Sequence, residues 1–160
     1  MSKFYRQADF TIAGYITQPI RIMVFVYPYR IDLADTDAAG VIYFAKAFEM
    51  CHSAYEHYLA TWAIALPEIV KSYSIALPIV HSEADFFQPL FWGDRVLVKV
   101  TSEPPRPHSF ELAYQITPEN QPDAIAISAR TRHVCINPQT RQKALLPEVL
   151  LKAIGEIKIS

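Results

Sequence analysis

A single long helical pattern, in a chain otherwise patterned for strands, limits most strongly what this sequence can fold into. Apolar residues recur at alternating spacings of four and three from about Ile42 to about Ala63, which is the period of an α-helix with one apolar face. The predicted apolar face carries Phe44, Phe48, Cys51, Tyr55, Tyr58 and Trp62. Polar residues fill the opposite side, so the pattern predicts a helix that is buried along one face.

Five other segments alternate between apolar and polar residues, which is the period of strands that bury one face. The first runs from Val24 to Leu33, and its predicted inner face carries Tyr27, Tyr29, Ile31 and Leu33. The other four follow the helix, at about 77–87, 95–102, 108–117 and 123–136. Shorter helices are expected from Pro67 and from about 146 to 157. Because short turns join antiparallel neighbours, we expect an α+β domain with one five-stranded antiparallel sheet curled around the long helix.

Length and composition narrow the functional classes. The 160 residues fit one domain, and residues 1–22 break any period at Gly14, Gln18 and Pro19, so we expect an N-terminal extension outside a core of 23–160. A net charge of −1 gives no global attraction for nucleic acid or an anionic membrane. No apolar run reaches the roughly 20 residues of a membrane span, and the two cysteines lack metal-type spacing. A reduced, cytoplasmic protein is expected.

Two carboxylates, Asp35 and Asp37, lie in a polar loop directly before the predicted long helix. The first turn of a helix offers unpaired N–H groups at a positive dipole end, which can stabilise an oxyanion. A carboxylate just upstream could attack a carbonyl or activate a water, so the arrangement suits acyl transfer. Two alternatives stay open: an Asp before a helix commonly caps it, and a metal site would need a third ligand that the local spacing lacks. Both carboxylates are used if Asp35 fixes the loop and Asp37 faces a ligand.

Residues 35–44, Asp-Thr-Asp-Ala-Ala-Gly-Val-Ile-Tyr-Phe, resemble the signature of hotdog-fold thioesterases of the 4-hydroxybenzoyl-CoA thioesterase type. The resemblance covers about residues 24–147, and with residues 45–56 it is closest to the 1,4-dihydroxy-2-naphthoyl-CoA thioesterases of cyanobacteria and plastids, which act in phylloquinone (vitamin K1) synthesis. It implies the hotdog fold and hydrolysis of an aromatic acyl-CoA to the free acid and CoA. It implies no metal and no cofactor besides the CoA of the substrate, and a homodimer or homotetramer with each site at a subunit interface.

Carried over by position, the catalytic carboxylate of this family falls on Asp37. The backbone N–H that polarises the thioester carbonyl falls on Phe44, with Tyr43 beside it. Related general acyl-CoA thioesterases usually have His in place of Phe44 and Glu in place of His52, so both departures count against that branch. The apolar surface of Phe44 suits an aromatic acyl group. His52, on the flank of the helix, is a candidate for lining the acyl pocket or bonding a ring hydroxyl, although an interface histidine without catalytic duty is the commoner use of such a position.

Two arginines on the last predicted strand are candidates for binding the CoA phosphates. Arg130 and Arg132 are two residues apart and project to one face, and guanidinium groups bind phosphate oxygens in a bidentate manner. By resemblance, the nucleotide-contacting arginine falls on Arg132. A solvated outer sheet face is the alternative for Arg130. His81, His108 and His133 fall on strand patterns without motif support and receive no predicted role.

Three other functions share this fold class. A general acyl-CoA or acyl-carrier-protein thioesterase is possible because acyl choice depends on pocket shape. A 3-hydroxyacyl thioester dehydratase would need a His-Phe dipeptide, which this chain lacks. A non-catalytic acyl-CoA-binding domain would have no need of Asp37.

Overall fold

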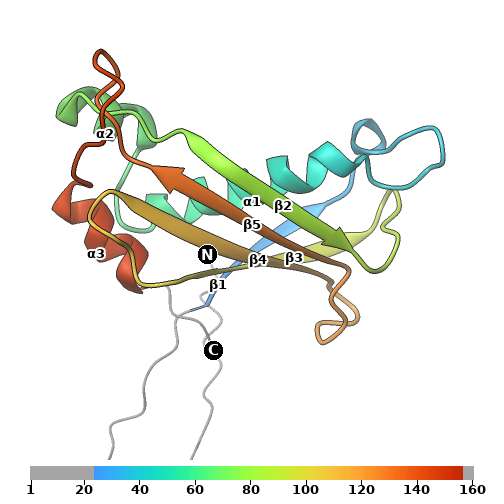
Figure 1. Cartoon of the computed structure of the whole chain (residues 1–160). Helices are drawn as coiled ribbons and strands as arrows, with labels where there is room; N and C mark the ends of the chain where they lie inside the picture. Colours follow the sequence, from blue (N-terminus) through green and yellow to red (C-terminus); the bar gives the residue numbers. More distant parts are fainter. Residues whose placement is uncertain (1–23, 157–160) are drawn as a thin grey trace, which may run out of the picture.

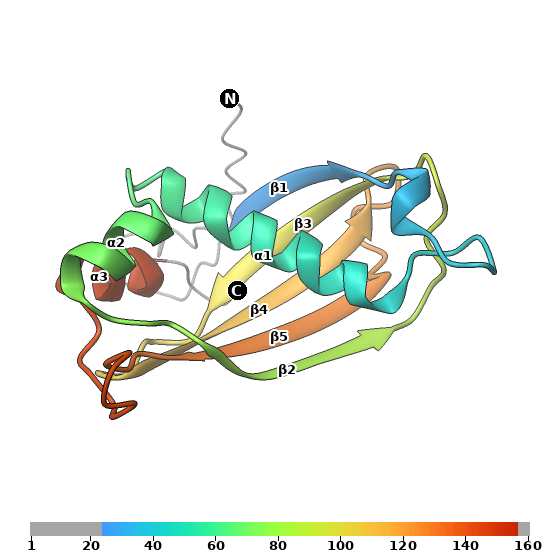
Figure 2. The ribbon, with the colours of Figure 1, turned by 90° about the horizontal axis from the view of Figure 1, so that it is seen from above.

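The computed structural model describes residues 24–156, which form one antiparallel sheet and three α-helices. The elements in chain order are β1 (Phe25–Arg30), a 3₁₀ turn η1 (Leu33–Asp35), α1 (Phe44–Ala60), α2 (Leu66–Tyr73), β2 (Ile79–Phe86), β3 (Arg95–Ser102), β4 (Ser109–Pro118), β5 (Ile127–Val134) and α3 (Glu148–Glu156). The strands lie in the order β1-β3-β4-β5-β2, and α1 crosses the concave face of the curved sheet (Figures 1 and 2). The predicted fold, a five-stranded antiparallel sheet around one long helix, is confirmed.

The central strands follow the predicted alternation closely. In β3 the inward residues Val96, Val98 and Val100 are almost fully buried, and β4 and β5 bury every second residue in the same way. Fully burying a side chain of this size stabilises the fold by about 1.5–3 kcal/mol. The inner faces of these three strands therefore form the surface on which α1 packs.

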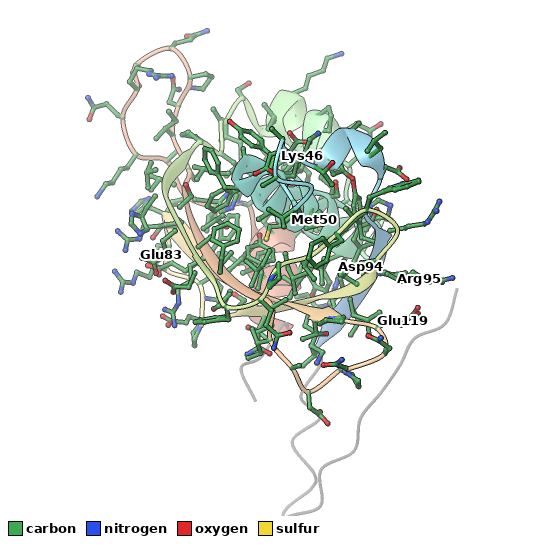
Figure 3. The ribbon with its side chains drawn as sticks, turned by 90° about the vertical axis from the view of Figure 1, so that its right-hand side faces the viewer. Lys46, Met50, Glu83, Asp94, Arg95 and Glu119 are labelled. Carbon is green, nitrogen blue, oxygen red and sulfur yellow. The ribbon has the colours of Figure 1, made fainter. Side chains whose placement is uncertain are left out.

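The buried face of α1 differs from the predicted one. Its buried residues are Ala47, Met50, Cys51, Ala54, Tyr55, Tyr58 and Leu59. Phe44 is 60% exposed and Phe48 is half-buried, so the prediction that both lie in the core is wrong for the single chain. Ala47 and Ala54 are small enough to let α1 lie against the sheet. The bulkier Phe44 and Phe48 lie toward the flank of the helix. Figure 3 shows Met50 pointing from α1 into the interior.

Two predicted strand ends are also corrected. The first strand ends at Arg30, and Leu33 is 67% exposed because the chain turns into η1 there. The last strand begins at Ile127 instead of about 123, since residues 121–124 form a hydrogen-bonded turn. The predicted extension, residues 1–22, lies outside the described residues.

The edge strand β2 is exposed on both faces. Of the described strands it pairs only with β5, and Ile79, Val80 and Phe86 are each about half exposed, at 46%, 55% and 46%. In Figure 2, α1 lies over the middle of the sheet and leaves β2 to one side. The face between α1 and β2 is hollowed, since Phe48 and His52 of α1 and Ile79 and Ser82 of β2 line a cavity there. Among the described residues, no helix has the length and apolar character needed to span a membrane.

Candidate active site

Asp35 anchors the loop between β1 and α1. Its carboxylate is 5% exposed, and Oδ2 accepts hydrogen bonds from the Tyr29 hydroxyl (2.9 Å) and from the Asp32 N–H (2.9 Å). The Asp35 carbonyl accepts from the N–H of Tyr43 at 2.8 Å, and Lys46 Nζ lies 3.7 Å from Asp35 Oδ1. Burial first, and then the hydrogen bond and charge of Asp35, raise the pKa of Tyr29 to about 12. Asp35 therefore ties β1, the loop and α1 together, as expected of a residue that fixes the loop.

Asp37 lies at the surface in a tight turn between the paired residues Thr36 and Ile42. Its Oδ1 accepts from the Ala39 N–H at 2.8 Å, and its own N–H donates to the Val41 carbonyl at 2.9 Å. Gly40 closes the turn with a positive φ of 79°, a conformation that glycine adopts without strain. Among the described residues no side chain caps α1, so Asp37 does not serve as the helix cap, and the residue is exposed.

The start of α1 has backbone N–H groups without helical partners, next to exposed aromatic side chains. Tyr43 occupies the N-cap position with an extended backbone, and the first helical N–H groups, beginning with Phe44, have no partner inside a helix. The side chains of Tyr43 and Phe44 are exposed, with ring centroids 4.7 Å apart. A hydrogen bond from the Ile42 N–H to the Leu90 carbonyl (2.8 Å) holds this segment against the β2–β3 connection. The connection between β1 and α1, and the start of α1 itself, thus lie at one end of the sheet (Figure 2).

A cavity of about 190 Å³ opens between α1 and β2. It is lined by Phe48, His52, Ile79, Ser82, Tyr114, Thr131 and His133. Phe48 and His52 follow Phe44 by four and eight residues, so they continue one helix face from the free N–H groups into the cavity. His52 is exposed, with Nε2 3.5 Å from Glu56 Oε1. His52 lines this cavity, and its predicted role in binding an acyl group stays a prediction.

Three buried polar side chains form a chain along the wall of this cavity. Thr131 Oγ1 lies 3.3 Å from the Tyr114 hydroxyl and 3.1 Å from His133 Nε2, and all three residues are at most 5% exposed. Burial, followed by the nearby His52, lowers the pKa of His133 to about 4. No role for His133 was predicted from the sequence. The available signal was that Thr131 and His133 interrupt the otherwise apolar inner face of the last strand.

The two candidate phosphate-binding arginines lie on the other face of the sheet. Alternation along β5 turns Arg130 and Arg132 outward when Thr131 and His133 point inward. Arg132 Nε is 2.9 Å from Glu111 Oε1, and Arg130 lies opposite Glu83 of β2, which Figure 3 shows on the outer surface. Within one chain the arginines do not line the cavity. The described residues also contain no group of three His, Cys, Asp or Glu placed to hold a metal ion.

Comparison with known proteins gives a consistent family. Residues 31–154 match the sequence model of the thioesterase-like superfamily. A 1,4-dihydroxy-2-naphthoyl-CoA hydrolase of Picosynechococcus sp. is 44% identical, covering 80% of this chain and 90% of the relative. The corresponding hydrolase of Rippkaea orientalis is 43% identical, covering 79% of this chain and 91% of the relative. A crystal structure of a 1,4-dihydroxy-2-naphthoyl-CoA thioesterase from Synechocystis has a TM-score of 0.78 at 40% identity, covering 82% of this chain and 95% of that one.

Proposed function

This chain belongs to the thioesterase-like superfamily, and from that membership we propose that it hydrolyses 1,4-dihydroxy-2-naphthoyl-CoA to the free acid and CoA. The observation that carries the proposal is the identity of 43–44% to relatives named for this activity, over about nine-tenths of their length. The geometry supports it independently. An exposed carboxylate, free helix N–H groups and an adjoining cavity with apolar and polar walls are what an aromatic thioesterase requires.

We propose that the thioester carbonyl binds at the N-terminus of α1, where the Phe44 N–H donates to its oxygen. Charge that develops on this oxygen during attack is stabilised by the helix dipole and the fixed donor. Asp37 acts either by attacking the carbonyl carbon, which gives an acyl-aspartyl anhydride and the CoA thiolate, or by taking a proton from the attacking water. Tyr43, beside Phe44, contributes apolar surface next to the reacting carbon.

The two routes place ¹⁸O from labelled water in different molecules. A single turnover in H₂¹⁸O, with enzyme in excess, places ¹⁸O in the product acid if water attacks the thioester directly. If Asp37 attacks first and water then opens the anhydride at the aspartyl carbonyl, the label enters Asp37 and the first product acid contains ¹⁶O. Mass spectrometry of the product and of the peptide that contains Asp37 reads both.

We propose that two copies of the chain pair so that the open face between α1 and β2 becomes part of a subunit interface. The two elements and the β2–β3 connection carry six exposed large apolar side chains, namely Phe44, Ile79, Val80, Phe86, Phe87 and Phe91. An unpaired edge strand with this character invites pairing with a second chain. A homodimer, or a homotetramer built from it, is the expected state, and light scattering after gel filtration tests it.

A substrate panel tests the proposed function. We expect kcat/KM to be highest for 1,4-dihydroxy-2-naphthoyl-CoA, lower for benzoyl-CoA and lowest for palmitoyl-CoA. A value for palmitoyl-CoA equal to or above the naphthoyl value would leave only a general acyl-CoA thioesterase. Absence of thiol release from all three would instead indicate an acyl-CoA-binding domain.

A further inference from the structure

The hydrogen bonds that join Tyr114, Thr131 and His133 run in one direction, because each of these three groups has a single proton to donate. A neutral histidine has one N–H donor and one acceptor nitrogen, and each hydroxyl has one proton. The ring of His133 is neutral near pH 7, and a hydrogen bond with the Leu77 backbone favours its protonated form. A backbone group with this effect is a carbonyl, which takes the only N–H of the neutral ring.

The remaining nitrogen, Nε2, faces Thr131 and therefore accepts. With this tautomer, Thr131 donates its proton to Nε2 across 3.1 Å, and the Tyr114 hydroxyl in turn donates to Thr131 Oγ1 across 3.3 Å. Both hydroxyl protons are then used inside the chain. The second lone pair of the Tyr114 oxygen remains unused, so these three residues present an acceptor to the cavity.

We propose that Tyr114, Thr131 and His133 form a relay that ends in an acceptor and selects acyl groups carrying a phenolic hydroxyl on the ring, an inference that rests on the proposed thioesterase function. A phenolic O–H donates to the Tyr114 oxygen. A ring that lacks this hydroxyl leaves the buried acceptor unpaired, which is the kind of mismatch that enzymes reject most sharply.

The dimensions of the cavity agree with this role. Its volume of about 190 Å³ compares with the roughly 150 Å³ of an apolar cavity that admits benzene, so it receives one aromatic ring. At 1.5 Å per residue, Phe48 and His52 lie about 6 and 12 Å along α1 from Phe44. A ring whose thioester sits at Phe44 therefore extends along this helix face into the cavity.

The chemistry of the substrate indicates which hydroxyl is read. In a 1,4-dihydroxy-2-naphthoyl thioester, the 1-hydroxyl is adjacent to the carbonyl and bonds to it internally. The 4-hydroxyl, across the ring, has a free proton. The relay is therefore assigned to the 4-hydroxyl, and 1-hydroxy-2-naphthoyl-CoA is the matched substrate that lacks only this group.

The experiment compares kcat/KM for these two thioesters in wild type, Tyr114→Phe and Thr131→Val. Wild type is expected to prefer the dihydroxy thioester at least about tenfold, the value of one well-formed hydrogen bond of about 1.4 kcal/mol. Tyr114→Phe removes the acceptor and should lower kcat/KM for the dihydroxy thioester about tenfold, while the 1-hydroxy thioester changes less than about threefold. Thr131→Val should reduce the preference in the same direction.

Thr117→Val is the matched control. Thr117 is fully buried in β4, its hydroxyl has no partner among the described residues, and it does not line the cavity. It should leave the substrate preference unchanged. Equal losses on both thioesters in Tyr114→Phe, or a wild type without preference, would overturn the relay.

Binding of the two free acids, measured by calorimetry, separates this inference from the proposed function. A protein that cleaves both thioesters but binds both acids equally refutes the relay and leaves the thioesterase standing. A protein that cleaves neither, yet binds the dihydroxy acid at least tenfold more tightly, with the difference lost in Tyr114→Phe, refutes the thioesterase and supports the relay.

Discussion

The buried His133 should make folding stability depend on pH in a defined window. Its pKa is about 4 in the folded chain, against 6.5 for an ordinary histidine. Between these two pH values His133 is protonated in the unfolded chain and neutral in the folded chain. The free energy of unfolding therefore falls as the pH falls. Each pKa unit corresponds to about 1.36 kcal/mol, so the difference of about 2.5 units corresponds to about 3 kcal/mol lost between pH 7.5 and 4.

Urea unfolding at pH steps from 7.5 to 4, at fixed protein concentration, measures this loss in wild type and in His133→Gln. The difference between the two proteins isolates His133 from the carboxylates that titrate in the same range. The neighbouring Tyr55 and Tyr114 stay neutral throughout because burial raises their pKa values. His57→Gln, at an exposed histidine, is the control and should follow wild type. If the difference between wild type and His133→Gln stays constant within about 0.5 kcal/mol, the buried neutral histidine is refuted.

Three further predictions follow from the site and the core. Asp37→Asn should lower kcat/KM at least about a hundredfold, about 2.7 kcal/mol of barrier, with an unchanged melting temperature because the residue is exposed; near-normal turnover would contradict its role. Met50→Ala should lower the free energy of unfolding, measured with urea, by about 2–5 kcal/mol, because Met50 is buried. Phe48→Ala should lower it clearly less, because Phe48 is only half-buried. The reverse order would contradict the buried face of α1 described above. Arg132→Ala should raise KM for acyl-CoA without changing kcat, because Arg132 is the candidate for binding the CoA phosphates. Glu111→Ala removes only the carboxylate partner of Arg132 and should not raise KM.

The parts of the fold that the sequence predicted are those in which local pattern and burial agree. Strand β3 matches its predicted bounds because Val96, Val98 and Val100 alternate in a central strand that is buried on one face. The buried face of α1 was misplaced because Ala47 and Ala54 carry little hydrophobic signal, although their small size sets how closely the helix approaches the sheet. Leu33 was misassigned because the turn there depends on the Asp35 side chain, which no alternation reveals.

The candidate site divides in the same way. Asp37 and the Phe44 N–H are contiguous in sequence, so a local motif suffices to find them. Tyr114 and Thr131 come from different strands, and their proximity depends on the register that places Tyr114 opposite Ala129. Strand register is set by the packed sheet and not by either strand alone, so the relay could only be found in the structure.

The position of β2 in the sheet has a consequence for synthesis of the chain on the ribosome. This strand emerges before β3, β4 and β5, yet within residues 24–156 its only partner is β5, the last of the described strands to be made. Until residues 127–134 have left the exit tunnel, β2 has no strand to pair with, and Ile79, Val80 and Phe86 remain available to other nascent chains. Chains that stop before Ile127 should therefore be recovered in inclusion bodies, whereas chains completed through Val134 can close the sheet.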